Sequence, residues 1–257
     1  MAFAELDGIR IRYELVGDAS LPTLLLSNSL GANLAMWEPQ VNPLGSRFRL
    51  LRYDTRGHGS SSVPPGPYTI VALGQDVLHL LDFLEIEQAG FCGISMGGVI
   101  GQWLGVNAPD RIHKLILANT AAKIGVAEVW DTRIETVLRD GLDSVIPGTL
   151  ERWFTPPFHA ARPEIIATIS AMLHATNLQG YAACCAAIRD ADFRASLHAI
   201  PTPTLVIAGT HDPVTTPKDA QFLAENIPRA SYVELPAAHL SNVEAASEFS
   251  AALHGFL

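Results

Sequence analysis

The sequence predicts an α/β fold with a mostly parallel central sheet, flanking helices and an inserted helical cap. Short apolar runs alternate with helical patterns along most of the 257 residues, which is typical of strands buried in a parallel sheet. This alternation stops after Asn119 and returns near Pro203. We therefore expect a core in two parts, residues 1–120 and 196–257, separated by a helical cap at residues 121–195.

The predicted strands fall into two kinds. Near the N-terminus, Ile9, Ile11 and Tyr13 alternate with charged residues, which predicts a half-buried antiparallel strand. The later runs are continuously apolar, as expected of parallel strands covered on both faces. These runs are Thr23–Leu26, Phe48–Tyr53, Ala89–Cys92, Lys114–Ala118 and Thr204–Ala208.

The predicted helices lie between these strands and within the cap. Their apolar residues recur at helical spacing, unlike the continuous runs of the strands. In the core we expect helices at Thr69–Leu84, Ser95–Asn107, Pro217–Asn226 and Ala245–Leu257. In the cap we expect them at Val126–Arg139, Leu150–Phe154, Pro163–His174 and Tyr181–Arg189.

Composition and charge narrow the function. Hydrophobic residues make up 48% and charged residues 17%, which excludes a disordered chain. A formal net charge of −9 argues against a nucleic-acid partner. No signal-peptide pattern begins the sequence, and no apolar run approaches the length of a membrane span. The three cysteines are odd in number and two are adjacent, which predicts a reduced, cytoplasmic protein without a disulfide framework or metal site.

The stretch Gly93–Gly97 reads G-I-S-M-G and lies between a predicted strand and a predicted helix. A nucleophilic serine on such a tight turn adopts strained backbone angles, and side chains at the two flanking positions would collide. The helix N-terminus then directs free amides toward a developing negative charge. We expect Ser95 to be a nucleophile. The alternative is a small-residue turn that only packs a helix onto the sheet.

A nucleophilic serine needs a base, and the base needs an orienting carboxylate. Asp212 and His239 follow Ser95 in the expected chain order, and each comes after an apolar strand. The ends of strands are where open α/β sheets place their sites. Other candidates fit less well: His211 adjoins the acid, His58 lies in a glycine-rich loop suited to turns, Asp219 is helical and Glu234 lies within a strand.

The apolar run that begins at Thr23 breaks abruptly into Ser-Asn-Ser-Leu-Gly at residues 27–31. A serine hydrolase needs two backbone amides to bind the tetrahedral oxyanion, one after the nucleophile and one from an earlier loop. We expect Met96 to supply the first amide and Leu30 the second. The alternative is an ordinary loop between a strand and a helix.

Together these motifs resemble those of the α/β-hydrolase superfamily along nearly the whole chain. They are the stretches at 54–59, 93–97 and 209–212, and His239. Many members carry His-Gly where this chain has Asn28-Ser29. The stretch LSNSLGANLAMWEPQV, with VWDTRIETVLRDGLDSV, LERWFTPPF and AACCAAIRDADFR of the cap, is similar to β-ketoadipate (3-oxoadipate) enol-lactone hydrolases of aromatic catabolism.

That resemblance implies that Ser95 attacks the lactone carbonyl, that His239 takes its proton, and that no metal or organic cofactor takes part. It also implies a small anionic substrate, so the cap should present a cation. We expect Arg133 to bind the carboxylate, because it shares a helical face with Trp130. Trp130, Trp153 and Phe154 would pack around the lactone ring of the substrate. Alternatively, Arg133 is a solvated surface charge and the tryptophans only pack within the cap. The other candidates for binding the substrate carboxylate are Arg139, Arg152 and Arg189.

Other functions remain open at this point. The same residues would serve another carboxylic-ester hydrolase, a carbon–carbon bond hydrolase of ring-cleavage products, or a cofactor-free perhydrolase. A dehalogenase is disfavoured because its nucleophile is an aspartate, whereas this turn carries Ser95. A receptor that retains the pocket but turns over slowly is a further alternative. Whether the chain forms a homo-oligomer is also open.

Overall fold

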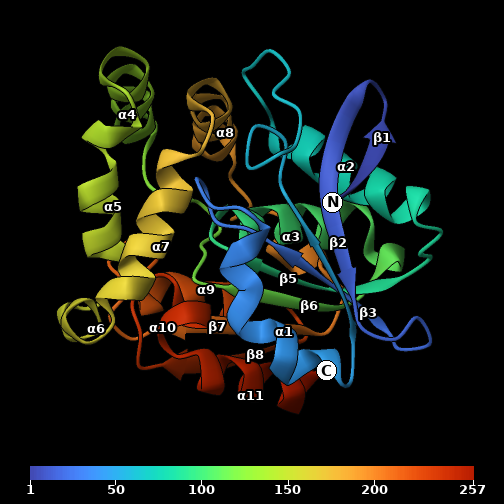
Figure 1. Ribbon diagram of the computed structural model, residues 1–257. Helices are drawn as coiled ribbons and strands as arrows, with labels where there is room; N and C mark the ends of the chain where they lie inside the picture. The colour runs from blue at the N-terminus through green and yellow to red at the C-terminus, as the bar shows by residue number, and fades with distance from the viewer.

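The computed structural model describes residues 1–257 and contains one eight-stranded sheet in the order β1-β2-β4-β3-β5-β6-β7-β8 (Figure 1). β2 pairs antiparallel with β1 and β4, and all other neighbouring strands are parallel. The predicted fold class is therefore confirmed. The strands are β1 (Ala2–Leu6), β2 (Ile9–Val16), β3 (Thr23–Ser27), β4 (Arg49–Tyr53), β5 (Ala89–Ile94), β6 (Ile112–Ala118), β7 (Thr204–Gly209) and β8 (Ala230–Leu235).

Helices cover both faces of this sheet (Figure 1). α2 packs against α3 on one face, and α1 packs against α11 on the other. β3, β5 and β7 are buried along their whole length, which explains why their sequences are continuously apolar. The helices of the core are α1 (Glu38–Gly45), α2 (Ile70–Phe83), α3 (Met96–Asn107), α9 (Pro217–Asn226), α10 (Ser241–Glu244) and α11 (Ala246–Phe256).

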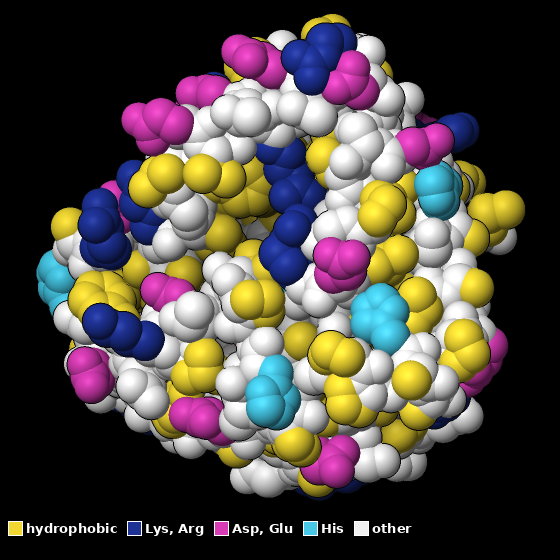
Figure 2. Space-filling view, turned by 90° about the vertical axis from the view of Figure 1, so that its left-hand side faces the viewer, with side chains coloured by type: hydrophobic (Ala, Val, Ile, Leu, Met, Phe, Trp, Pro, Cys, Tyr) yellow, Lys and Arg dark blue, Asp and Glu magenta, His cyan; other side chains and the backbone are white.

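Between β6 and β7 the chain forms five α-helices, two short 3-10 helices and no strand. We call the α-helices the cap helices: α4 (Ala127–Asp140), α5 (Ile146–Trp153), α6 (Pro156–Ala161), α7 (Pro163–His174) and α8 (Leu178–Asp190). α4 packs against α8, and α5 and α6 pack against α7. Figure 2 shows the side of the molecule that these helices form, where Lys or Arg side chains border a hollow lined with hydrophobic side chains.

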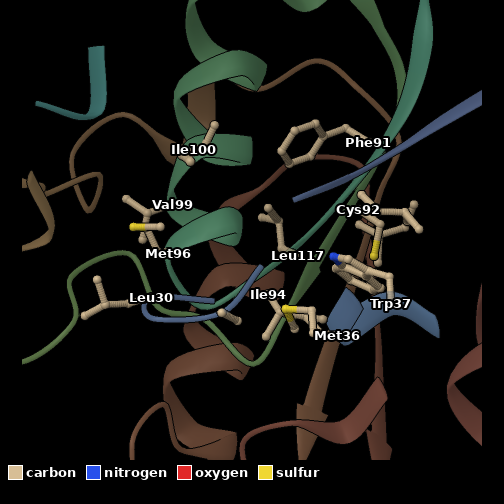
Figure 3. Packing of buried hydrophobic residues seen from close by; sticks show 14 of the residues in the cluster. Leu30, Met36, Trp37, Phe91, Cys92, Ile94, Met96, Val99, Ile100 and Leu117 are labelled. Atoms are coloured by element: carbon tan, nitrogen blue, oxygen red, sulfur yellow. The ribbon is translucent and has the colours of Figure 1, made fainter. Parts of the chain in front are cut away.

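One hydrophobic cluster joins the sheet, its helices and the cap helices. Figure 3 shows Ile94, the last residue of β5, beside Met36, and Met96, the first residue of α3, on the side of Leu30 in the loop after β3. Trp37 is fully buried in the same cluster, and its indole Nε1 donates a hydrogen bond to Asn28 Oδ1 at 2.9 Å. The segment that follows β3 is therefore fixed to the rigid core on which any site at this edge would be built.

Two further sequence predictions concern cysteine and membranes. All three cysteines are buried and free, with Cys92 in β5 and the adjacent pair, Cys184 and Cys185, in α8. None of the helices has the length and the hydropathy that crossing a bilayer requires.

Candidate active site

Ser95 lies on the tight turn between β5 and α3, with φ 57° and ψ −114°. A positive φ is strained for any residue with a side chain. The flanking glycines make this turn feasible: a Cβ on Gly93 would lie 2.1 Å from the carbonyl oxygen of Gly97, and one on Gly97 would lie 2.2 Å from that of Ser27. Three chain segments thus meet closely around Ser95, as the G-x-S-x-G pattern predicts.

His239 and Asp212 are joined by a hydrogen bond of 2.8 Å between Nδ1 and Oδ2. Asp212 follows β7 and His239 follows β8, so the parallel strands bring both to the same edge of the sheet. Both side chains are buried. The carboxylate holds the proton of the imidazole on Nδ1, which leaves Nε2 free to accept a proton.

The environment of Asp212 favours its ionised form. Burial opposes ionisation, but the charge of His239 and hydrogen bonds from His239, Asn119 and Thr215 outweigh it and hold the pKa of the carboxyl below its ordinary value. The backbone N–H groups of Val214 and Thr215 donate to Oδ1, and the Thr215 hydroxyl donates to Oδ2. A carboxylate with this many donors remains an acceptor for the imidazole N–H.

Asn119 is a residue of this site that the sequence analysis did not single out. It directly follows β6 and adopts φ 43°, a region that Asn tolerates better than most residues. Its amide donates to Asp212 Oδ2 at 3.0 Å and to the carbonyl of Ala238 at 3.1 Å, while its Oδ1 accepts from the Ser241 hydroxyl. Asn119 therefore ties the loop of the acid to the loop of the histidine.

Leu30 lies in a tight turn formed by Ser29–Ala32, which the N–H of Ala32 closes onto the carbonyl of Ser29 at 3.1 Å. The Leu30 N–H donates no hydrogen bond within the protein. Met96 is the first residue of α3, where backbone N–H groups have no partner inside the helix. The N–H of Gly97 donates to the carbonyl of Asn28 at 3.0 Å, so the two segments with candidate oxyanion donors are bonded to each other.

A cavity of about 50 Å³ contains Ser95, His239 and Leu30 together. Residues of the cap helices close it: Trp130 and Arg133 from α4, Thr149, Arg152 and Trp153 from α5, and Tyr181 from α8. Ser29, Ile124 and Val214 complete its lining. The structure thus brings the predicted nucleophile and base together with three of the four predicted cap residues.

Two arginines face this cavity without a carboxylate partner. Arg133 donates from Nε to the Tyr181 hydroxyl and from one terminal nitrogen to the Thr149 hydroxyl, both at 2.8 Å. Arg152 contacts the same Thr149 hydroxyl at 3.4 Å. Burial, followed by the neighbouring charge of Arg133, lowers the pKa of Arg152. Two half-buried cations near an unpartnered serine form a site suited to an anionic ligand.

Comparisons with known proteins identify the family of the chain. Residues 22–144 match the family described as alpha/beta hydrolase fold. The chain is 47% identical to 3-oxoadipate enol-lactonase 2 of Acinetobacter baylyi, over 97% of this chain and 93% of that protein. The chain belongs to the α/β-hydrolase family. It is also 41% identical to 3-oxoadipate enol-lactonase 1 of the same organism, over 97% of this chain and 94% of the relative.

The solved structures agree as well. This α/β hydrolase superposes on the enol-lactonase from Burkholderia xenovorans LB400 with a TM-score of 0.98 and 44% identity, covering 99% of each chain. The match spans the sheet and the cap helices alike, because both lie within the covered length.

Phe154 lies outside the cavity of this α/β hydrolase, although we expected it to wall the ring. It follows the last residue of α5, stacks on Phe158 with ring centroids 5.2 Å apart, and lines a neighbouring hollow of about 490 Å³. The chain turns between Trp153 and Phe154. Trp153 therefore lines the cavity that contains Ser95, whereas Phe154 lines the neighbouring hollow. Arg152 borders both.

The remaining candidates have other partners. Arg139 pairs with Asp140, and Arg189 pairs with Asp131 and Asp190. Asp219 completes a capping box with Thr216 at the start of α9, and Glu234 accepts from the Tyr232 hydroxyl. His211 lines the neighbouring hollow. Nowhere in residues 1–257 do three or more His, Cys, Asp or Glu side chains form a group that could hold a metal ion.

Proposed function

We propose that this α/β hydrolase opens 3-oxoadipate enol-lactone to 3-oxoadipate, with Ser95, His239 and Asp212 as its catalytic residues. The observation that supports this substrate best is Arg133, a half-buried cation without a carboxylate partner in the cavity that holds Ser95. The relatives whose names specify this reaction share 47% and 41% of their residues with the chain over nearly its full length.

In the first half of the proposed reaction, Ser95 Oγ attacks the lactone carbonyl and His239 Nε2 accepts the hydroxyl proton. Asp212 stabilises the imidazolium that forms, since its carboxylate already accepts from Nδ1 at 2.8 Å. The N–H groups of Leu30 and Met96 bind the oxyanion of the tetrahedral intermediate. Its collapse breaks the ring C–O bond, and the leaving enolate takes the proton from His239 Nε2. The resulting enol, still tethered to the acyl group, tautomerises to a ketone, and His239 is again a free base.

In the second half, His239 removes a proton from a water molecule, which attacks the acyl carbon. The same two amides bind the second oxyanion. Collapse of this intermediate breaks the bond to Ser95 Oγ, which recovers its proton from His239. The product carries one carboxylate more than the substrate, because water has opened an ester.

The cap residues would select the substrate. A guanidinium carries five N–H donors, and Arg133 uses one on Tyr181 and one on Thr149. The others are available for the substrate carboxylate, with the ring between Trp130 and Trp153. Arg152 would add positive charge at the boundary of the cavity. We further propose that residues 121–195 form the cap unit. We also propose a cytoplasmic location, because three free thiols suit a reducing compartment.

The deciding experiment is to compare kcat/KM for 3-oxoadipate enol-lactone and for a neutral aryl ester, with Ser95→Ala as the blank. We expect rapid lactone opening that Ser95→Ala abolishes, and a much lower rate on the ester. Equal, low rates on both would reject the lactone as substrate. If a ring-cleavage product whose carbon–carbon bond is hydrolysed, or a perhydrolase substrate, gave a higher kcat/KM, that reaction would replace lactone opening as the proposed function.

A further inference from the structure

The turn at Ser29–Ala32 is held from outside by groups that the proposed reaction does not use. Gly31 has φ +84° and the turn is closed by the bond from Ala32 to Ser29, which is the pattern of a type II turn with glycine at its third position. In such a turn the peptide unit between Leu30 and Gly31 can rotate toward the type I orientation. A shift of Gly31 itself would move the adjoining backbone of the turn, and with it the N–H of Leu30.

On the core side, His58 holds this peptide unit. The N–H of Gly31 donates to His58 Nε2 at 2.8 Å, and His58 is buried in the loop that follows β4. Because Nε2 accepts, a neutral His58 carries its proton on Nδ1, which faces the carbonyl of Arg56 at 3.4 Å. The glycine-rich loop, for which the sequence analysis expected only turn structure, thus places a buried acceptor beneath the turn.

The same loop supports the turn at a second point. Asp54 Oδ1 accepts from the N–H of Leu34 at 2.9 Å, just beyond the turn, and Oδ2 accepts from the N–H of Ser60 at 2.8 Å. Asp54 and His58 therefore bind two backbone amides of the segment that contains Leu30.

On the cap side, Thr176 holds the other end of the same residue. Its hydroxyl donates to the carbonyl of Gly31 at 2.7 Å, and Thr176 lies in the short connection between α7 and α8. The cap also packs directly on Gly31: a Cβ there would lie 2.8 Å from Leu173 Cδ2 and 3.2 Å from the ring of Tyr181. The N–H of Gly31 is thus bonded to the core, and its carbonyl to the cap.

We propose that His58 and Thr176 are positioning residues that clamp Gly31 between core and cap, and that the seated cap thereby sets the orientation of the Leu30 amide in the oxyanion hole. An oxyanion donor must lie within a few tenths of an ångström of its ideal distance to be effective. The cap then contributes to catalysis through Thr176 as well as to substrate binding. This inference rests on the serine mechanism proposed above but not on the identity of the substrate.

The test uses variants that remove or keep each hydrogen-bonding group. His58→Asn is too short to place an acceptor at Nε2, whereas His58→Gln keeps one there; Thr176→Val removes the hydroxyl, whereas Thr176→Ser keeps it. We expect kcat to fall roughly tenfold in His58→Asn and about fivefold in Thr176→Val, with KM changed less than about twofold. His58→Gln and Thr176→Ser should stay within about threefold of the parent protein.

A second readout isolates the oxyanion. An aryl trifluoromethyl ketone forms a hemiketal oxyanion with an active serine, so its affinity should fall in parallel with kcat, while the affinity of a carboxylate product analogue should not change. A neutral aryl ester and this ketone report on the clamp even if the enol-lactone is not the substrate. His174→Asn and Thr168→Val serve as matched controls. Both side chains are exposed on α7, and they bond to Asp143 and to the carbonyl of Glu164 rather than to the turn.

The proposal is overturned if the folded variants keep kcat and ketone affinity within about twofold of the parent, or if KM alone changes. Melting temperatures establish that each variant is folded at the assay temperature. If His58→Asn is unfolded there, the Thr176 pair decides the question by itself. Thr176→Val replaces the hydroxyl by a methyl group, whereas Thr176→Ser removes only the methyl group and keeps the hydroxyl.

Discussion

Asn119 donates a hydrogen bond to the same oxygen of Asp212 that accepts from His239: the Nδ2–Oδ2 distance is 3.0 Å, and the Nδ1–Oδ2 distance is 2.8 Å. A neutral amide from the end of β6 thus shares the carboxylate with the imidazole. It adds a donor that favours the ionised acid without adding a charge that would compete with the imidazolium.

Asn119→Asp should therefore be harmful although it keeps the shape of the side chain. It places a carboxylate oxygen about 3 Å from Asp212 Oδ2, and two like charges at that distance cannot both remain ionised. We expect kcat/KM to fall between about tenfold and a hundredfold, and the acid limb of the pH–rate profile to move to higher pH. Asn107→Asp is the control, since Asn107 is exposed and bonds only to the carbonyl of Trp103. An unshifted acid limb would show that Asn119 does not influence the charge of Asp212.

Arg133→Gln should discriminate between charged and neutral substrates. Losing a charged donor in a half-buried site costs about 3 kcal/mol, or roughly a hundredfold in kcat/KM, for the carboxylated lactone. A neutral aryl ester should change less than about threefold, because it offers no carboxylate. Arg152→Gln should have a smaller effect, since Arg152 lies at the boundary of the cavity.

Arg139→Gln provides the control for these arginine variants. Arg139 is exposed, pairs with its neighbour Asp140, and lies on the same helix as Arg133. If Arg133→Gln impaired lactone and ester hydrolysis equally, the residue would support the fold of the cap rather than bind the substrate carboxylate.

Ser95→Gly should be inactive and yet more stable than Ser95→Ala. The backbone at this position has φ 57°, which strains alanine as it does serine but not glycine. We expect the free energy of unfolding of the glycine variant to exceed that of the alanine variant by about 1 kcal/mol, after the larger chain entropy of unfolded glycine is subtracted. Urea unfolding of the two variants measures this. Equal stabilities would mean that the turn carries no strain at Ser95.

The strands and helices of the core could be predicted because their burial is uniform. Thr204–Ala208 and Pro217–Asn226 were expected, and the structure has Thr204–Gly209 and Pro217–Asn226. Three elements of the core were not expected: β1, α1 and the four-residue helix α10. β1 is a short edge strand with mixed burial, and α1 contains Pro43 within a polar sequence. Neither carries a clear apolar period, so tertiary contacts rather than local pattern determine them.

The candidate site could be predicted where a residue type alone implies its chemistry. Ser95, Asp212 and His239 have few alternatives in a hydrolase, and their positions after strands could be inferred from the sequence. Asn119 and Thr176 could not, because an amide or a hydroxyl occurs in many loops and its partner is distant in sequence. The different positions of Trp153 and Phe154 also depend on how the chain turns after α5, which composition does not indicate.

His58 gives the protein a predictable loss of stability in acid. Burial lowers the pKa of His58 to about 4, against 6.5 for the exposed side chain. Between these values the unfolded chain binds a proton that the folded protein does not, so the free energy of unfolding decreases as the pH falls from 6.5 toward 4. The loss between pH 7 and pH 5 should be about 2 kcal/mol. Three groups face the His58 ring: the N–H of Gly31, the carbonyl of Arg56 and the thiol of Cys184. The nearby acidic residues are Asp54, in the same loop, and Asp76 of α2, which pairs with Arg56.

His58→Gln removes this titration while keeping an acceptor for Gly31, so urea unfolding of the two proteins at pH 7 and pH 5 isolates the effect. We expect the parent protein to lose about 2 kcal/mol more than the variant over this interval. Burial raises the pKa of Asp54 and of Asp76. Both carboxyls are present in the parent protein and in the variant, so the difference between the two proteins reports on His58. Equal losses in both proteins would mean that His58 has the same pKa in the folded and the unfolded chain.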